Sequence, residues 1–258
     1  MPWNPDRYHQ FQRERSAPFE DALALVERRG GLSVIDLGCG TGELTRRLAD
    51  ALPESETLGL DSSPEMLERA KPLERPGLRF ERGALEEVEG VWDVVFSHAA
   101  IHWVEDHPAL VPRLLSLVRP GGQLVVQMPS NHHHPTHQFI LETASEEPFV
   151  SALNGWTRHS PVLPVEQYAD LLYAAGAVHL TVFEKVYPHV LQDADALADW
   201  TSGTALVPYS ERLPKALHEL FMQRYRERLR ARYPASPVFY GFRRILFEAT
   251  CPAEEVGG

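Results

Sequence analysis

The sequence predicts an α/β protein built on a doubly wound, mostly parallel sheet of about seven strands. Three observations predict this class. Short apolar runs rich in Val, Ile and Leu recur in the first half of the chain, as expected for strands buried on both faces. Helical segments alternate with these runs, which favours parallel strands joined by crossover helices. A glycine-rich turn follows the first run, at the strand end where such sheets bind ligands.

The predicted elements can be placed in chain order. The first five strands are residues 34–37, 56–61, 78–81, 91–97 and 123–128, and two more are residues 178–187 and 239–247. Helices between them are predicted over residues 43–49, 64–71 and 107–118, and Pro120-Gly121-Gly122 stops the last of these.

The second half of the chain predicts a cap. Residues 139–163 are expected to be mostly helical, residues 165–175 form a helix that ends at Gly176, and residues 193–233 are helical again, with a basic helix over 220–232. About 50 residues between the last two strands are too many for a hairpin loop. We therefore expect a single domain over residues 1–258, with a helical substrate cap built from residues 1–20, 132–163 and 189–238.

The turn after the first strand favours a cationic ligand. Gly38, Gly40 and Gly42 allow positive φ and close approach of a ligand to the backbone. The third glycine comes one residue earlier than in the G-x-G-x-x-G pattern of dinucleotide sites, and Glu43 takes the glycine's place. Asp36 and Glu43 add negative charge where a pyrophosphate would lie. An anionic ligand is therefore a poor fit.

Asp61 ends the second strand and follows Gly42 by 19 residues. A carboxylate at this position can accept hydrogen bonds from both hydroxyls of a ribose. The alternative is that Asp61 caps the helix that starts at Pro64, although Ser62 and Ser63 lie nearer to that start. Met66 on this helix is either a core residue or a contact to the edge of a base.

Polar residues follow the fourth strand, where ligands bind in open α/β sheets. His98 and His102 are each either a catalytic base or a hydrogen-bonded wall residue. At the N-terminus, Tyr8, Phe11 and Arg15 lie on one helical face, which predicts either a lid over the glycine turn or a helix packed on the sheet.

A metal site is not expected. His132, His133, His134 and His137 lie in a Pro-containing loop, without the helical spacing or neighbouring carboxylates that fix an ion. Cys39 and Cys251 form neither a metal-ligand spacing nor a disulfide framework.

The charge and the hydropathy of the chain argue against two classes of partner, nucleic acids and membranes. The net charge of −11 and the lack of a long Lys/Arg run argue against nucleic-acid substrates. No cleavable leader and no apolar run of about 20 residues is seen, so we expect a soluble cytoplasmic protein without a membrane partner. The chain is expected to be a monomer.

The motif Asp36-Leu37-Gly38-Cys39-Gly40-Thr41-Gly42 resembles motif I of the class I S-adenosylmethionine-dependent methyltransferases. The resemblance implies their Rossmann-like sheet and S-adenosyl-L-methionine as cofactor, with the motif holding its positively charged amino-acid end. Ala84 departs from the pattern, because many of these enzymes carry an Asp there for the adenine amino group. The implied cofactor residues are Asp36, Gly38, Gly40, Gly42, Asp61, Ser62, Met66, Leu85 and Ser97.

A wider resemblance covers nearly the whole chain and points to the trans-aconitate methyltransferases. It rests on Trp3-Asn4-Pro5, Glu14-Arg15-Ser16, Asp61-Ser62-Ser63-Pro64, Gln127-Met128-Pro129, Pro135-Thr136-His137, Asp199-Trp200 and Arg244. That family esterifies a carboxylate of trans-aconitate, a reaction that needs positioning and no general base. The implied substrate residues are Tyr8, Arg15, His102, Gln127, Trp200 and Arg244. Arg158 is a further candidate to donate hydrogen bonds to a carboxylate of the substrate.

One departure from that family affects the choice of acid. Val207 stands where an arginine is expected before the proline, so one carboxylate clamp is missing. The alternatives are a methyltransferase acting on another carboxylate, either acyl-carrier-bound or in a natural product, and a non-catalytic protein that binds S-adenosylmethionine.

Overall fold

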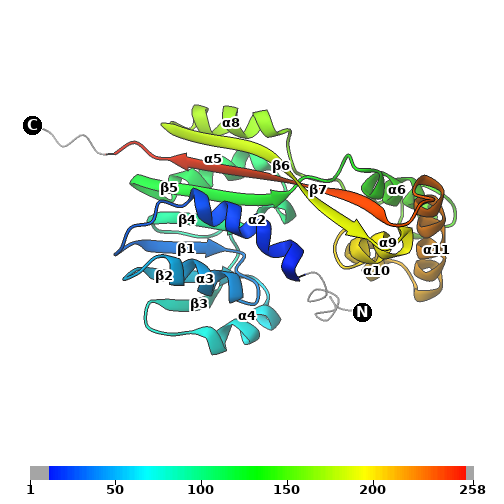
Figure 1. Cartoon of the computed structure of the whole chain (residues 1–258), viewed down its shortest axis with the longest axis horizontal. Coiled ribbons are helices and arrows are strands. Elements are labelled where there is room, and N and C mark those ends of the chain that lie inside the picture. Colours follow the sequence, from blue (N-terminus) through cyan, green and yellow to red (C-terminus); the bar gives the residue numbers. More distant parts are fainter. Residues whose placement is uncertain (1–11, 254–258) are drawn as a thin grey trace, which may run out of the picture. The chain divides into compact units, whose positions relative to one another are not determined.

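The computed structural model describes residues 12–253. Within this range seven strands form one sheet in the order β3-β2-β1-β4-β5-β7-β6 (Figure 1). Strands β1 to β5 are parallel, and β7 runs antiparallel to β5. The predicted class, a doubly wound and mostly parallel α/β sheet, is confirmed. The strands are β1 (Ser33–Leu37), β2 (Glu56–Asp61), β3 (Leu78–Arg82), β4 (Trp92–His98), β5 (Val118–Pro129), β6 (His179–Leu191) and β7 (Val238–Thr250).

The helices connect these strands in the predicted order. They are α2 (Gln12–Leu25), α3 (Glu43–Ala51), α4 (Pro64–Ala70), α5 (His107–Ser116), α6 (Pro135–Ala144), α7 (Phe149–Ala152), α8 (Val165–Ala174), α9 (Ala194–Ser202), α10 (Val207–Arg212) and α11 (Lys215–Arg232), with short 3-10 helices η1 (Lys71–Leu73) and η2 (Ile101–Trp103). None of the helices in the described range is both long enough and apolar enough to cross a membrane.

Neighbouring residues of each central strand face opposite sides of the sheet, and helices cover both sides. Val34 and Val94 contact apolar residues of α2 and α3 on one face. Ile35 and Val95 belong to the core on the other face, which includes residues of α5 and α8. Both faces of β1 are therefore buried, as its continuous apolar run predicts.

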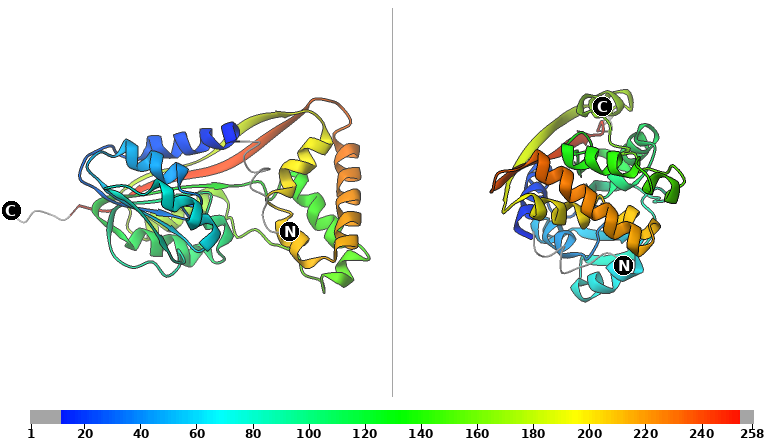
Figure 2. Two further views of the ribbon diagram at one scale, coloured as in Figure 1. Left: turned by 90° about the horizontal axis from the view of Figure 1, so that it is seen from below. Right: turned by 90° about the vertical axis from the view of Figure 1, so that its right-hand side faces the viewer.

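The chain divides into two compact units. The sheet unit comprises residues 17–129, 161–185 and 244–258, and the helical unit comprises residues 1–16, 130–160 and 186–243, as far as each is described. In the helical unit α11 packs against α6 and α9, as Figure 2 shows. A separate core of buried aromatic and aliphatic side chains, including Tyr209, Phe221, Tyr225 and Tyr240, fills this unit.

Several predicted boundaries are wrong: β6 ends at Leu191 and β7 at Thr250, both later than predicted, and α11 begins at Lys215, earlier than predicted. Two further errors have a local cause. Strand β5 begins at Val118, because Trp92 pairs with Val118 across a register shift in β4, so Pro120-Gly121-Gly122 lies inside the strand. Residues 153–164 contain no helix: α7 ends at Ala152, and Asn154 and Gly155 both adopt positive φ, which breaks the helical path. The expected lid falls largely on residues 1–11, which lie outside the described residues.

Candidate functional site

The turn after β1 has the backbone conformation that its glycines predict. Gly38, Gly40 and Gly42 have φ of 81°, 57° and 82°. A Cβ on Gly38 would lie 2.2 Å from the Cβ of Ala100, and a Cβ on Gly42 would lie 2.8 Å from the Phe80 ring. A Cβ on Gly40 would meet nothing within 4 Å. The turn is therefore closed by packing at both ends and open at its middle residue.

Asp61 bonds to this turn. Its Oδ2 accepts a hydrogen bond from the backbone N of Gly40 at 2.9 Å, and its Oδ1 accepts one from the backbone N of Ser63 at 2.8 Å. The side-chain cap of α4 is Ser63, whose Oγ accepts from the backbone N of Met66. Ser63, and not Asp61, therefore provides the side-chain cap of α4. The half-buried Asp61 carboxylate lies beside the glycine turn.

Asp36, near the end of β1, is a buried carboxyl with one satisfied oxygen. Its Oδ2 accepts from the Thr45 hydroxyl at 2.6 Å, and Oδ1 has no hydrogen-bond partner within residues 12–253. Burial raises the pKa of Asp36 to about 7; the Thr45 hydrogen bond opposes that shift, and the charge of Asp61 adds to it. Oδ1 can therefore accept a hydrogen bond from a cationic ligand.

The other predicted cofactor residues occupy different environments. Ser97 is fully buried, and its Oγ donates to the carbonyl of Leu37 at 2.9 Å, which joins β4 to the end of β1. Leu85 is partly buried and packs against the core on the α5 side of the sheet. Met66 is half-buried and Ser62 is exposed. In the structure the Ser97 hydroxyl therefore forms a hydrogen bond that joins two neighbouring strands.

A second group of polar side chains lies at the carboxyl ends of β4 and β5. The Gln127 amide nitrogen donates to Nε2 of His98 at 3.0 Å, and its oxygen accepts from Nη1 of Arg244 and from the backbone N of Met128, each at 3.1 Å. Gln127 is fully buried and Arg244 is 7% exposed. Burial, together with the nearby Arg244 charge, lowers the pKa of His98 to about 3. His98 is therefore neutral near pH 7 and a weak base.

His102, in η2, is half-buried beside Trp103, with ring centroids 5.0 Å apart. The loop that carries it is secured by His107 and Tyr168, two residues that sequence reasoning missed. Nδ1 of His107 bonds the Tyr168 hydroxyl at 2.6 Å, and Nε2 bonds the carbonyl of Ile101 at 3.0 Å. A tyrosine on the apolar face of α8 was the available signal, because a buried hydroxyl needs a partner.

Trp200, a predicted substrate residue in the helical unit, is 6% exposed. Its ring lies 4.8 Å from the ring of His189 and 5.8 Å from that of Phe242, measured between centroids. The structure therefore places Trp200 in an aromatic cluster. The backbone N of Arg158 donates to the Tyr209 hydroxyl at 3.1 Å. Tyr8 and the side chain of Arg15 lie outside the described part of the chain.

The histidines of residues 132–137 have local roles. His134 caps α6, since its Nδ1 accepts from the backbone N of Thr136 at 3.2 Å. Burial, followed by the positive charge of neighbouring histidines and Arg158, lowers the pKa of His137 to about 3. No three His, Cys, Asp or Glu residues gather around a possible ion position within the described range.

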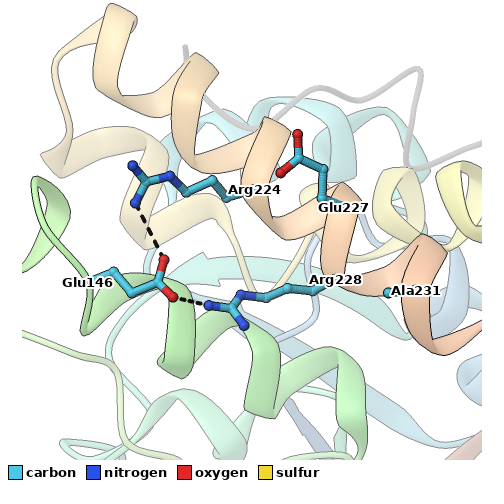
Figure 3. A pocket seen from close by; sticks show the side chains of 5 residues that line it. All are labelled: Glu146, Arg224, Glu227, Arg228 and Ala231. Carbon is cyan, nitrogen blue, oxygen red and sulfur yellow. Dashed lines mark hydrogen bonds and ion pairs between the residues drawn. The ribbon is translucent and has the colours of Figure 1, made fainter.

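An open pocket of about 350 Å³ lies between α11 and the segment after α6 (Figure 3). Glu146, Arg224, Glu227, Arg228 and Ala231 line it. Arg224 and Arg228 both pair with Glu146, and Arg228 also pairs with Glu142. Its arginines are therefore already matched by carboxylates, and no predicted cofactor or substrate residue lines it.

Comparison with known proteins identifies the family. Residues 34–122, which hold the glycine turn and Asp61, match the model of the methyltransferase domain family. The chain is 48% identical to the trans-aconitate 2-methyltransferase of Deinococcus radiodurans, over 98% of this chain and 99% of that protein. The chain belongs to the trans-aconitate 2-methyltransferase family. A second member, from Rhizobium meliloti, is 36% identical over 97% of this chain and 99% of its own length.

Solved structures resemble this family member in fold. The YcgJ protein from Bacillus subtilis matches with a TM-score of 0.61 over 92% of this chain and 99% of that chain, at 15% identity. Phosphoethanolamine N-methyltransferase 2 of Haemonchus contortus, solved with S-adenosyl-L-methionine, matches with a TM-score of 0.52 over 90% of this chain and 52% of that chain, at 16% identity. At these identities the matches support the fold alone.

Proposed function

We propose that this protein transfers a methyl group from S-adenosyl-L-methionine to a carboxylate of trans-aconitate and so forms a methyl ester. The observation that carries the proposal is the 48% identity, over nearly the whole of both chains, to a trans-aconitate 2-methyltransferase. The glycine turn with its two carboxylates, Asp36 and Asp61, is the part of the structure that fits the cofactor.

The fit to the cofactor rests on charge and on unused hydrogen-bond capacity. The amino-acid end of the cofactor carries an ammonium and a sulfonium, and Asp36 keeps a buried oxygen without a partner in the described chain. Asp61 retains lone pairs for ribose hydroxyls beyond its bonds to Gly40 and Ser63. The proposed cofactor residues are Asp36, Gly38, Gly40, Gly42, Asp61, Ser62, Met66, Leu85 and Ser97.

The reaction requires little from the protein besides alignment. A carboxylate of the acid is already ionised at neutral pH, and its oxygen attacks the methyl carbon while the electron pair of the breaking carbon–sulfur bond stays on sulfur. No proton is transferred, so no general base is needed, which agrees with the low pKa of His98. Holding the two reactants in line supplies about 7–11 kcal/mol in favourable cases.

The acid is a polyanion and needs cationic donors. Arg244 at the carboxyl end of the sheet, with Gln127 and His102, supplies the sheet-unit part of the proposed substrate site. The other substrate residues we propose are Tyr8, Arg15, Arg158 and Trp200, which belong to the segments proposed as a cap, residues 1–20, 132–163 and 189–238. Arg15 and Arg244 are the guanidinium groups we expect to meet carboxylates.

A second candidate substrate class is a small carboxylic acid other than trans-aconitate. Val207, the first residue of α10, is half-buried and cannot bind a carboxylate. An acid with fewer carboxylates, or with a different spacing between them, would not need a donor there.

The test is incubation with methyl-labelled cofactor and a panel of di- and tricarboxylates. Base-labile label on trans-aconitate supports the proposal, because methyl esters hydrolyse in alkali and carbon- or nitrogen-linked methyl groups do not. Transfer to a simpler acid in preference to trans-aconitate supports the second candidate, and absence of transfer to every acid contradicts both. A monomeric state, a cytoplasmic location and the absence of nucleic-acid binding remain predictions.

A further inference from the structure

The Gln127 amide connects the two side chains beside it. In β5, Gln127 pairs with His98 of β4 on one side and with Leu246 of β7 on the other. Its nitrogen bonds His98 and its oxygen bonds Arg244. The reverse orientation would set the amide oxygen against the His98 acceptor and the amide nitrogen against two donors, so the hydrogen bonds allow only one orientation.

This orientation fixes the tautomer of His98. Because Nε2 accepts the hydrogen bond from Gln127, the single proton of the neutral imidazole must lie on Nδ1. Among the described residues, Arg244 supplies the charge that acts on His98, and Phe19 of α2 packs edge-on against its ring at 5.6 Å between centroids. Both neighbours disfavour a charged imidazole.

The same amide orients Arg244. Arg244 is 7% exposed, and its Nη1 bonds the Gln127 oxygen, a neutral acceptor that does not cancel the charge of the guanidinium. Since Arg244 pairs with Pro129 at the end of β5, this charge lies at the carboxyl edge of the sheet. A carboxylate at position 127 would instead cancel it.

We propose that Gln127 is a positioning residue for the acid substrate. Its amide holds His98 in the Nδ1–H tautomer and orients the Arg244 guanidinium, so that the positive charge of Arg244 lies beside a neutral imidazole at the carboxyl edge of the sheet. The inference rests on the proposed function, because that function gives Arg244 a carboxylate to bind. Gln127 acts through its two neighbours and need not contact the acid.

The first experiment measures KM and kcat for trans-aconitate between pH 6 and 9. Gln127→Glu should raise KM at pH 8 by about tenfold or more while kcat changes by less than about threefold, because binding is lost and alignment of the bound acid is kept. The defect should shrink toward pH 6, because protonation of a buried Glu restores the positive charge. The wild-type KM should not change with protonation of His98 over this range.

A matched pair of variants separates positioning from stability. Gln123 is a buried glutamine of the same strand. Its side chain bonds the Glu248 carboxylate, the backbone carbonyl of Leu25 at the end of α2 and the backbone N of Glu27. Gln127→Met should raise KM at every pH, whereas Gln123→Met should reduce stability and leave KM within about twofold of wild type. Equal effects of the two variants on KM would overturn the positioning role.

The second experiment needs no substrate. In protein labelled with nitrogen-15 at histidine, long-range proton–nitrogen correlations should show His98 in the Nδ1–H form and neutral from pH 5 to 9, with the signal assigned by its loss in His98→Gln. Gln127→Met should give a mixture of tautomers. A proton on Nε2 in the wild type would overturn the proposal. If the wild type methylates no acid, the proposed function fails, and this spectrum still decides whether Gln127 sets the tautomer.

Discussion

Asp36 is held in a state that costs stability unless a ligand binds. Its pKa is raised from 3.8 to about 7, chiefly by burial. The folded state therefore binds a proton more tightly than the unfolded state between these two values. The stability that protonated Asp36 contributes is present below about pH 4 and is lost as the pH rises toward 7. At pH 8 the folded protein carries a buried charge on Asp36, and Oδ1 has no hydrogen-bond partner among residues 12–253.

Asp36→Asn should therefore stabilise the ligand-free protein at pH 8. Asn keeps an oxygen for the Thr45 hydroxyl and removes the buried charge, so the free energy of unfolding should rise by roughly 1–4 kcal/mol at pH 8 and by less than half as much at pH 5. Urea unfolding at both pH values measures this. The cofactor affinity of the variant should fall. A variant that is destabilised equally at both pH values would show that Asp36 is not a strained buried acid.

Asp61→Ala tests the other carboxylate of the turn. If Asp61 accepts hydrogen bonds from two ribose hydroxyls, its loss should weaken cofactor binding by about 1–3 kcal/mol, measured by isothermal titration calorimetry. Ser63→Ala is the matched control, because it removes the α4 cap and keeps the Asp61 carboxylate. Unchanged affinity in Asp61→Ala would remove Asp61 from the cofactor site.

At the scale of elements, a buried hydrogen bond between His107 and Tyr168 joins the start of α5, just after the β4 loop, to α8. The Tyr168 hydroxyl bonds His107 of α5 and the backbone N of Leu163, and lies 3.7 Å from the Met128 sulfur. Burial lowers the pKa of His107, which favours the neutral form of its ring. The contact therefore fixes the position of η2 and of His102.

Tyr168→Phe should destabilise the protein by about 1–3 kcal/mol, because it leaves the buried Nδ1 of His107 and the backbone N of Leu163 without this partner. Tyr173→Phe on the same helix is the control; that side chain is 76% exposed, so its stability should stay within about 0.5 kcal/mol of wild type. Chemical denaturation of the two variants provides the comparison. Similar unfolding curves for both would show that the buried hydroxyl does not support the loop.

The elements that sequence could predict are those whose pattern is local. Strands β1 to β4 agree with prediction to within a residue or so because their apolar runs are short, β-branched and bounded by turn residues. The start of β5 was missed because its pairing with Trp92 overrides a Pro-Gly-Gly turn signal. The hydrogen bonds of Gln127 and the His107–Tyr168 contact join residues far apart in sequence, which single-residue patterns do not reveal.

At the scale of the whole molecule, the two units differ in how much of their structure could be predicted from the sequence. The sheet unit follows from strand and helix periodicity and a recognisable turn. The helical unit depends on a core of tyrosines and phenylalanines, such as Tyr209 and Phe221, and on pairs such as Arg226 with Asp199. The buried residues of α11, Phe221, Tyr225 and Leu229, recur every four residues, so sequence predicted helices here but not which elements they pack against.

The net charge of −11 also acts on the whole molecule, because it repels a polyanionic acid at long range. Binding of such an acid must therefore depend on local cations such as Arg244, whose burial protects its charge from screening by salt.

Methylation of trans-aconitate by this protein can be measured in a competition assay with purified protein. Equal concentrations of trans-aconitate, cis-aconitate, citrate, isocitrate and succinate are incubated with S-adenosyl-L-methionine, and the products are identified by mass spectrometry. The monomethyl ester of trans-aconitate should be the main product, and its yield should be greatly reduced in Asp61→Ala. Methylation of another acid in its place, or of none, would show that trans-aconitate is not the substrate.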